Sequence, residues 1–356
     1  MKSIIKDSGS VYGSGLGWNA LKTVIETLKP SSIFILTDAN TEAHCLPIFI
    51  ERSELNIAYS ALQMPAGETF KTIETCVTLW NQLSELGADR ASLLINLGGG
   101  VVTDLGGFVA ATFRRGIACI NIPTSLLAMV DASVGGKNGV DLGVLKNQVG
   151  IIRAAECVIV DPLFLNTLPK AEIKSGMAEM FKHGLIASED YWKRMQHFSV
   201  HNTEKAFDLI WQSVSIKNEI VTKDPFEKNL RKSLNYGHTL GHAIESYCLE
   251  SPNNPTLLHG EAIAIGMILA TYISSEMLHF PKTQCNNITK TLLDHFRKQR
   301  FTEADIQTII TLLAFDKKNS HGVVYFVLLE EIGVIKTNQE VSDKLIRQAF
   351  SYYENF

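Results

Sequence analysis

Several signatures are missing from this 356-residue sequence, and each absence excludes a class of protein. Its 33 Lys and Arg stand against 37 Asp and Glu, a formal charge of −4 at pH 7, so the broad positive field of a nucleic-acid-binding protein is absent. No apolar run approaches the ~20 residues that span a bilayer. Residues 1–10 lack the apolar centre of a signal peptide, and the sequence contains no repeat or low-complexity segment. We therefore expect a soluble, cytoplasmic protein.

Cysteine is scarce, and none of the six cysteines forms a CxxC pair. Cys119 and Cys157 each lie inside a short apolar run, 118–120 and 157–159. This pattern indicates buried free thiols in a reducing compartment. The remaining cysteines are Cys45, Cys76, Cys248 and Cys285.

Residues 1 to about 165 alternate strand and helix signals, which predicts an α/β domain with a Rossmann-like parallel sheet. Apolar residues in 71–86 recur at helical spacing. The expected strands are 33–36, 91–97, 117–122 and 158–160.

Long helical patterns dominate from residue 169 onward, which predicts a second, mainly α-helical domain. We place the boundary at Leu168-Pro169, giving domains 1–168 and 169–356. The expected helices are 170–186, 204–222, 234–250, 260–278 and 303–314, and 323–329 is the one clear strand-like segment.

A glycine-rich turn follows the strand at 91–97, in Gly98-Gly99-Gly100, and leads into a helix-like stretch. Glycines at such a turn let backbone N–H groups approach a pyrophosphate, although an ordinary tight turn has the same composition. The turn is not a GxGxxG fingerprint. Asp38 ends an earlier strand, where a carboxylate can bind ribose hydroxyls, but a lone Asp there is more often a turn residue or helix cap.

Histidines with metal-ligand spacing lie in the second half of the chain. His238 and His242 share a helical face at i, i+4, and His259 opens the next apolar helix. Glu179 lies in a third helix, and one carboxylate with imidazoles suits Zn²⁺ or a similar ion. Each residue alone is more often an ordinary polar side chain. The Glu of a metalloprotease HExxH motif is missing.

Candidate anion-binding cations lie near these motifs. If one helix covers the region, Arg231 shares a face with Asn235 and His238. Lys137 follows two glycines in a turn that suits an anion. Isolated Lys and Arg are usually solvated; the others of interest are Arg114, Arg115, Lys146, Lys182 and Lys217.

Five blocks, spread in order over nearly the whole chain, resemble the 3-dehydroquinate synthase family. They are GGGVVTDLGGFVAATFRRG, IPTSLLAMVDASVGGKNGVD, LPKAEIKSGMAEMFKHG, RKSLNYGHTLGHAIE and LLHGEA. The resemblance extends from 65–68 to 316–318. It implies a homodimer whose active site lies in the cleft between a dinucleotide-binding α/β domain and a helical domain.

The resemblance also implies the cofactors NAD and one divalent metal, Zn²⁺ or Co²⁺. The metal ligands would be Glu179, His238 and His259. NAD would contact Asp38, Asn40, Glu68, Lys71, Gly98, Gly99, Gly100, Val101, Asp104, Thr124, Ser125, Lys137, Lys146 and Thr167.

The implied substrate is 3-deoxy-D-arabino-heptulosonate 7-phosphate, which a carbon–oxygen lyase of the shikimate pathway converts to 3-dehydroquinate and phosphate. Glu227 would handle a proton, and either Lys317 or Lys318 would reach the substrate. The substrate would be held by Arg115, Asp131, Lys137, Asn147, Lys182, Lys217, Arg231, Asn235 and His242.

Some positions depart from the family pattern and put loop geometry in doubt. Asn138 replaces a Thr, and the turn at 145–147 has lost a glycine. The segment between His242 and His259 is longer than usual, and 153–156 lacks an aromatic-x-Gln-Pro stretch.

Three alternative functions remain consistent with the sequence. A sugar-phosphate cyclase acting on sedoheptulose 7-phosphate or glucose 6-phosphate would share fold and cofactors, but Lys217, Arg231, Asn235 and His242 favour a substrate with a carboxylate. A metal-dependent NAD polyol or alcohol dehydrogenase would release NADH. A catalytically silent nucleotide- or metal-binding protein would show no turnover.

Overall fold

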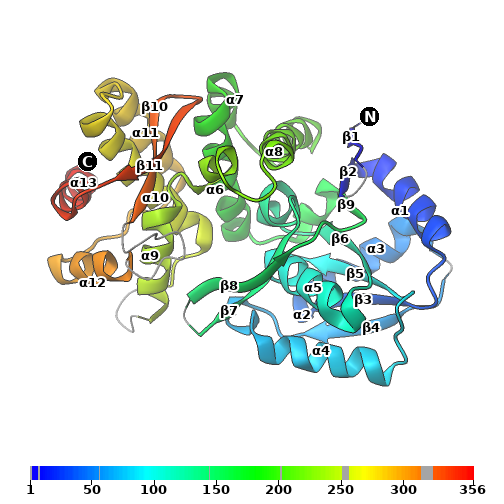
Figure 1. Cartoon of the computed structure of the whole chain (residues 1–356). Coiled ribbons are helices and arrows are strands. Elements are labelled where there is room, and N and C mark those ends of the chain that lie inside the picture. The colour runs from blue at the N-terminus through cyan, green and yellow to red at the C-terminus, as the bar shows by residue number, and fades with distance from the viewer. Residues whose placement is uncertain are drawn as a thin grey trace. The chain divides into compact units, whose positions relative to one another are not determined.

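The computed structural model describes residues 2–6, 9–55, 57–143, 145–200, 203–250, 256–313 and 324–356. The chain divides into two compact units (Figure 1). The first comprises Met1–Pro169 and Val200–Asn218, and the second Lys170–Ser199 and Glu219–Phe356. Helix α8 (Thr203–Lys223) crosses the division between Asn218 and Glu219. The predicted domain boundary at 168–169 stays a prediction.

The first unit is built on a seven-stranded sheet with the order β1-β2-β9-β6-β5-β3-β4. All neighbouring strands in this sheet pair in parallel except β1 and β2, which are antiparallel. The predicted parallel sheet is therefore confirmed. Its strands are β1 (Ser3–Ile4), β2 (Ser10–Gly13), β3 (Ile33–Asp38), β4 (Ser60–Met64), β5 (Leu93–Gly98), β6 (Ala118–Pro123) and β9 (Cys157–Val160).

Burial on both faces explains why the inner strands are mostly apolar. Every residue of β5 is buried, and Leu36, Leu94 and Leu105 belong to one hydrophobic cluster. Helix α5 packs on β5 and β6, and α1 packs on β9. The helices of this unit are α1 (Ser14–Leu28), α2 (Ala39–His44), α3 (Leu46–Ser53), α4 (Ile73–Glu85) and α5 (Gly100–Thr112).

A separate antiparallel hairpin, β7 (Lys137–Leu142) and β8 (Leu145–Ile152), packs against α5. The contact is close, because a Cβ at Gly107 would collide with the side-chain amide of Asn138. Asn138 itself donates hydrogen bonds to the carbonyls of Gly136 (3.0 Å) and Arg153 (2.8 Å). The residue that departs from the family pattern thus closes the base of the hairpin.

The second unit is mainly helical, as predicted, with α10 at its centre. Helix α10 packs against α6, α9, α11 and α13 and against strand β10. Among the described residues, its elements are α6 (Lys170–Ala187), α7 (Glu189–Met195), α9 (His238–Glu250), α10 (His259–Met277), α11 (Lys282–His295), α12 (Glu303–Leu313), α13 (Asp343–Asn355) and the hairpin β10 (Tyr325–Glu331) and β11 (Val334–Glu340).

The predicted helices at 170–186, 204–222, 260–278 and 303–314 agree with α6, α8, α10 and α12 to within one residue. The helix predicted at 234–250 begins late, at His238. A short 3-10 segment, Leu230–Asn235, precedes it, and Gly237 interrupts the chain with a φ of 78°. That left-handed conformation favours glycine and ends one helical segment before the next begins.

All six cysteines are free and buried, as the sequence predicted. Burial raises the pKa of the Cys76, Cys119 and Cys157 thiols to about 12. Within the part of the chain that the structure describes, no helix combines the length and apolarity needed to cross a membrane.

Candidate active site

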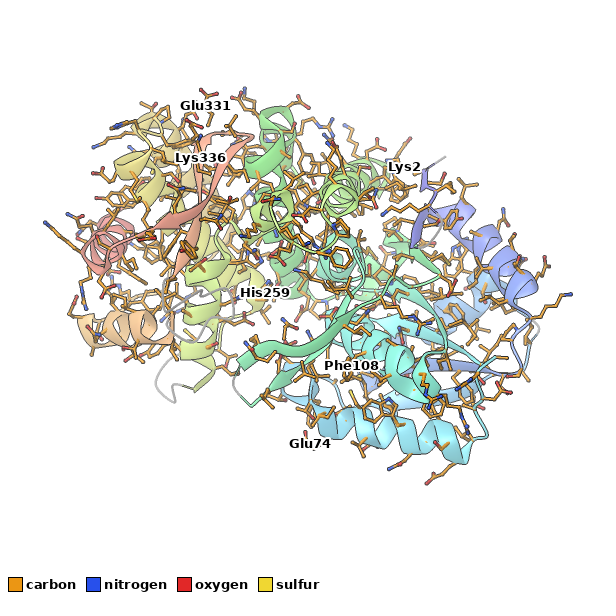
Figure 2. All side chains as sticks on the ribbon, in the orientation of Figure 1. Lys2, Glu74, Phe108, His259, Glu331 and Lys336 are labelled. Atoms are coloured by element: carbon orange, nitrogen blue, oxygen red, sulfur yellow. The ribbon has the colours of Figure 1, made fainter. Side chains whose placement is uncertain are left out.

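Helices α6, α9 and α10 bring together one carboxylate and three imidazoles (Figure 2 labels His259). Nitrogen atoms of His238, His242 and His259 lie within 4.8 Å of one another. The Oε1 atom of Glu179 lies 3.4 Å from His238 Nε2 and 3.5 Å from His259 Nε2. The structure therefore gathers the three residues that the sequence predicted as metal ligands, with His242 beside them.

Local packing fixes where these side chains stand. The backbone N–H of Gly260 donates to Ser175 Oγ at 3.0 Å, and a Cβ at Gly260 would collide with the Ser175 backbone. The first turn of α10, which carries His259, therefore lies directly on α6, which carries Glu179. His238 opens α9 immediately after the glycine break.

The donor set fits a tetrahedral cation. Donor atoms that share one such ion at about 2.1 Å lie about 3.4 Å apart. The two Glu179–histidine separations, 3.4 and 3.5 Å, match that value and exceed an ordinary charge-assisted hydrogen bond of about 2.8 Å. One buried carboxylate and neutral imidazoles are the ligand chemistry that Zn²⁺ and Co²⁺ accept.

Charges near Glu179 keep it ionised although it is fully buried. Lys182 Nζ forms an ion pair with Glu179 Oε2. Burial alone would raise the pKa of Glu179, but Lys182 and His238 outweigh burial and hold that pKa well below its usual range. The candidate site therefore contains an ionised carboxylate near neutral pH.

The two histidines facing Glu179 differ in their surroundings. Burial, assisted by Lys182, lowers the pKa of His238 to about 4, so this imidazole is neutral at pH 7. Its Nδ1 donates to the Tyr236 carbonyl at 3.2 Å, because a carbonyl can only accept. Burial also lowers the pKa of His259, but Glu245 and Glu179 outweigh burial and raise that pKa to about 10.

The predicted anion-binding residues of the second unit lie just before α9. Arg231 is 2% exposed, and its Nη1 donates to the Pro225 carbonyl at 2.8 Å. The backbone N–H of Arg231 donates to Asp224 Oδ2 at 3.0 Å. Asn235 Nδ2 donates to Glu227 Oε1.

The argument that placed Arg231, Asn235 and His238 on one helical face was wrong. Arg231 and Asn235 belong to the 3-10 segment and His238 to α9. Because no single helix contains all three residues, their i, i+4 and i+7 spacing does not place them on one face. The loop before α9 is instead organised by Asp224, which accepts hydrogen bonds from the backbone N–H groups of Lys228, Asn229 and Arg231.

Candidate anion-binding residues also lie in the first unit. Lys217 is buried and pairs with Asp131 Oδ1 at 2.7 Å. Lys137 is exposed and begins β7 directly after Gly135 and Gly136, which have φ values of 108° and 67°. Arg115 is exposed and has a positive φ of 70°.

The glycine turn has the geometry of an anion-binding helix start. Gly98 ends β5, Gly99 is the residue before α5, and Gly100 begins that helix. Thr124 N–H donates to Gly98 O at 2.9 Å, and a Cβ at Gly99 would stand 3.4 Å from Ser125 Oγ. The free N–H groups of the first turn are what a phosphate accepts from. Val101 lies in this first turn.

A polar network adjoins this helix. Lys71 is 4% exposed, and its Nζ contacts Asp104 Oδ2 at 2.6 Å and Asn147 Oδ1 at 2.7 Å. Burial would lower the pKa of Lys71, but Asp104 and Glu68 outweigh burial and raise it. Lys146 Nζ contacts Glu68 Oε1 at 3.0 Å. Four residues predicted to contact NAD thus lie together, and Asn147, predicted to contact substrate, lies with them.

The remaining predicted NAD residues are more dispersed. Asp38 caps α2, accepting from Thr41 N–H at 2.8 Å, so the helix-cap interpretation describes its contacts. Asn40 is exposed on that helix. Thr167 ends the 3-10 segment Pro162–Thr167 and donates to Phe164 O at 3.3 Å. Lys317 and Lys318 lie outside the described residues.

Sequence reasoning missed two carboxylates at these sites. Glu245 Oε2 lies 3.1 Å from His259 Nδ1. Asp141 accepts the Asn147 N–H at 2.6 Å and lies 3.5 Å from Lys146. The spacing of Glu245, seven residues after His238 and three after His242, is a helical signal that could have revealed it.

Comparison with known proteins identifies relatives for both halves of the chain. Residues 61–175 match the family described as 3-dehydroquinate synthase N-terminal, and residues 176–319 match 3-dehydroquinate synthase C-terminal. A 3-dehydroquinate synthase from Parabacteroides distasonis is 40% identical over 335 residues, covering 94% of each chain.

Two solved structures are also similar. A 2-deoxy-scyllo-inosose synthase, complexed with carbaglucose-6-phosphate, NAD⁺ and Co²⁺, is 26% identical with a TM-score of 0.83 and covers 98% of each chain. A 2-epi-5-epi-valiolone synthase from Streptomyces hygroscopicus with NAD⁺ and Zn²⁺ bound has a TM-score of 0.84, covering 100% of this chain and 99% of its own. At 22% identity, the latter shows the shared fold alone.

Proposed function

This chain belongs to the 3-dehydroquinate synthase family, and we propose that it converts 3-deoxy-D-arabino-heptulosonate 7-phosphate to 3-dehydroquinate and phosphate. It would act as a carbon–oxygen lyase of the shikimate pathway. The observation that carries the proposal is 40% identity to a 3-dehydroquinate synthase over 94% of both chains. The cluster of Glu179 with three histidines supports it independently.

The proposed cofactors are NAD and one divalent ion, Zn²⁺ or Co²⁺. NAD would bind the glycine turn and the Lys71 network, and the ion would bind Glu179, His238 and His259. The donor separations of 3.4 and 3.5 Å support the ligand assignment. The NAD⁺ and metal ions bound to the similar cyclases support the pair of cofactors.

When bound, NAD supplies reversible hydride transfer and the metal ion supplies Lewis acidity. The overall conversion is redox-neutral, because the substrate carbon that is oxidised is reduced again before ring closure. Transient oxidation makes the neighbouring C–H acidic, and loss of its proton expels phosphate. Ring opening and an intramolecular aldol addition then close the carbocycle.

Residues of this chain would bind the substrate and move its protons. His242, beside the proposed ligands, would accept the hydroxyl proton, directly or through water. Arg231 would bind an anionic group in the forked geometry that a guanidinium offers, and Asn235, held by Glu227, would orient a hydroxyl. The other proposed substrate contacts are Arg115, Asp131, Lys137, Asn147, Lys182 and Lys217.

We further propose a cytoplasmic homodimer. The six buried free thiols support a reducing compartment. The dimer is an expectation from the family, and size-exclusion chromatography with light scattering tests it.

One assay separates the proposed activity from its rivals. The purified protein receives the heptulosonate phosphate, metal and substoichiometric NAD, and phosphate and NADH are followed together. We expect many phosphates per NAD and no NADH accumulation. NADH that accumulates in proportion to substrate consumed would indicate a polyol dehydrogenase. Phosphate release from glucose 6-phosphate or sedoheptulose 7-phosphate in a parallel assay, without release from the heptulosonate phosphate, would indicate another sugar-phosphate cyclase.

A further inference from the structure

One face of α9 carries a third polar side chain besides the two histidines. His238, His242 and Glu245 follow one another at i, i+4 and i+7, so all three point to the same side of the helix. Glu245 Oε2 lies 3.1 Å from His259 Nδ1. None of the roles proposed above uses Glu245.

We propose that Glu245 is a positioning residue that holds the imidazole of His259 for metal binding; this inference rests on the proposed metal site. A carboxylate can only accept, so the proton between the two residues belongs to Nδ1 of His259. The opposite ring nitrogen, Nε2, then faces Glu179 Oε1 at 3.5 Å. Loss of the Nε2 proton on metal binding leaves the Nδ1 hydrogen bond intact.

Backbone packing makes this arrangement rigid. Helices α9 and α10 approach so closely that a Cβ at Gly241 would lie 2.7 Å from Ile263 Cδ1, and one at Gly266 would collide with the Gly237 carbonyl. Glu245 stands on one of these helices and His259 on the other. The separation of the carboxylate and the imidazole is therefore set by two close-packed backbones.

Comparison with His238 shows how the Glu245 carboxylate differs from a backbone acceptor. Its Nδ1 is also occupied, but by the backbone carbonyl of Tyr236 at 3.2 Å. That acceptor is a backbone amide, whereas Glu245 offers a carboxylate, the acceptor type that increases the electron density of a ligating imidazole. Both ligand rings are thus oriented with Nε2 toward Glu179, but by different acceptors, and the acceptor at His259 can be removed by substitution.

The test measures metal affinity without any turnover. Metal-free wild-type protein, Glu245→Ala and Glu245→Gln are titrated with Co²⁺, read by its visible d–d absorption, and with Zn²⁺ against a chelator of known affinity. Glu276→Gln is the matched control, because it removes a carboxylate from the far end of α10, where Glu276 pairs with Lys282 at 3.4 Å. Thermal unfolding of each metal-free protein reports on the fold.

We expect Glu245→Ala to weaken metal binding about 10- to 100-fold. Glu245→Gln retains an acceptor and loses the charge, so its loss should be smaller, with an altered Co²⁺ spectrum. Glu276→Gln should bind like wild type. Affinities of Glu245→Ala and Glu245→Gln within twofold of wild type, with an unchanged Co²⁺ spectrum, would overturn the inference.

Two further outcomes keep the test decisive. If Glu245→Ala does not fold, the nearly isosteric Glu245→Gln decides through affinity and spectrum: change in either supports the positioning role, and change in neither refutes it. If wild-type protein binds no divalent metal, the proposed function fails and this inference with it. If the wild type binds metal tightly and the Glu245 variants bind it equally well, the inference is refuted while the proposed function stands.

Discussion

Replacing Lys71 by methionine should destabilise the first unit by leaving Asp104 without its cation. Lys71 is 4% exposed and contacts Asp104 at 2.6 Å and Asn147 at 2.7 Å. Methionine fills most of the volume of the aliphatic chain, so the main loss is electrostatic. The substitution therefore isolates the value of the buried ammonium group.

The expected loss of stability follows from the burial of both Lys71 and Asp104. Removing one partner of a buried ion pair typically costs about 3–5 kcal/mol. The side chain of Asp104 is 18% exposed, so water compensates part of this loss, and we expect about 2–3 kcal/mol. In a unit of this size each kcal/mol corresponds to about 2–4 °C in Tm.

The sign of the pH dependence follows from Asp104. Burial raises the pKa of Asp104, and Lys71 opposes that rise, so the substitution raises it further. A carboxyl whose folded pKa exceeds its unfolded value of about 4 destabilises the folded state once the pH rises above that unfolded value. The deficit of the variant should therefore grow from pH 4 toward pH 7 and shrink again on acidification.

Urea unfolding monitored by tryptophan fluorescence measures the effect, because Trp18 and Trp80 lie in the first unit. Lys22→Met is the matched control in the same unit: the side chains of Lys22 and its partner Glu54 are 36% and 74% exposed, so loss of that pair should cost far less stability than loss of the Lys71 pair. The double variant Lys71→Met/Asp104→Asn should regain part of the loss. Equal stability of the Lys71 and Lys22 variants, or a deficit that is independent of pH, would refute the reasoning.

Two further predictions concern the second unit. Chelation should abolish activity, Zn²⁺ or Co²⁺ should restore it, and alanine at Glu179, His238 or His259 should sharply reduce bound metal per chain; stoichiometric metal in all three variants, measured by atomic emission, would contradict the ligand assignment. Arg231→Ala should weaken transition-state binding by on the order of 2–4 kcal/mol and lower kcat/KM accordingly. NAD affinity should stay near wild type, since Arg231 is not among the residues proposed to contact NAD. Steady-state kinetics at saturating NAD and a separate NAD titration measure the two effects, and equal losses in both would show that Arg231 is misplaced.

Elements with strong periodicity were predictable, and elements with weak periodicity were not. Strand β5 is mostly apolar, with Asn96 as its one polar side chain, because both of its faces are covered, so its position follows from composition. The β7–β8 hairpin combines glycines with exposed Val149 and Ile151, and it has no clear alternation of buried and exposed positions. Helix α13 is an exception to this rule: no helix is among those expected at 343–355, although Ile346, Ala349, Phe350 and Tyr353 form an apolar stripe at helical spacing.

At the candidate site, the sequence predicted candidate residues but not several of their side-chain contacts. The two histidines of α9 can be recognised from their i, i+4 spacing within a helix. The approach of Glu179 to them depends on the packing of α6 against α10 at Gly260, which no local pattern encodes. The helix predicted to begin at 234 fails because Gly237 adopts a positive φ, a backbone choice that glycine permits but does not require.

The buried thiols allow local opening of the structure to be measured by alkylation of its own cysteines. Thiol reagents attack the thiolate, and burial raises the pKa of Cys119 and Cys157 to about 12 and that of Cys248 to about 11. Alkylation at pH 8 must therefore wait until the surrounding structure opens. Cys119 and Cys157 belong to the first unit and Cys248 to the second, so peptide-resolved alkylation rates give a separate opening free energy for each half of the enzyme.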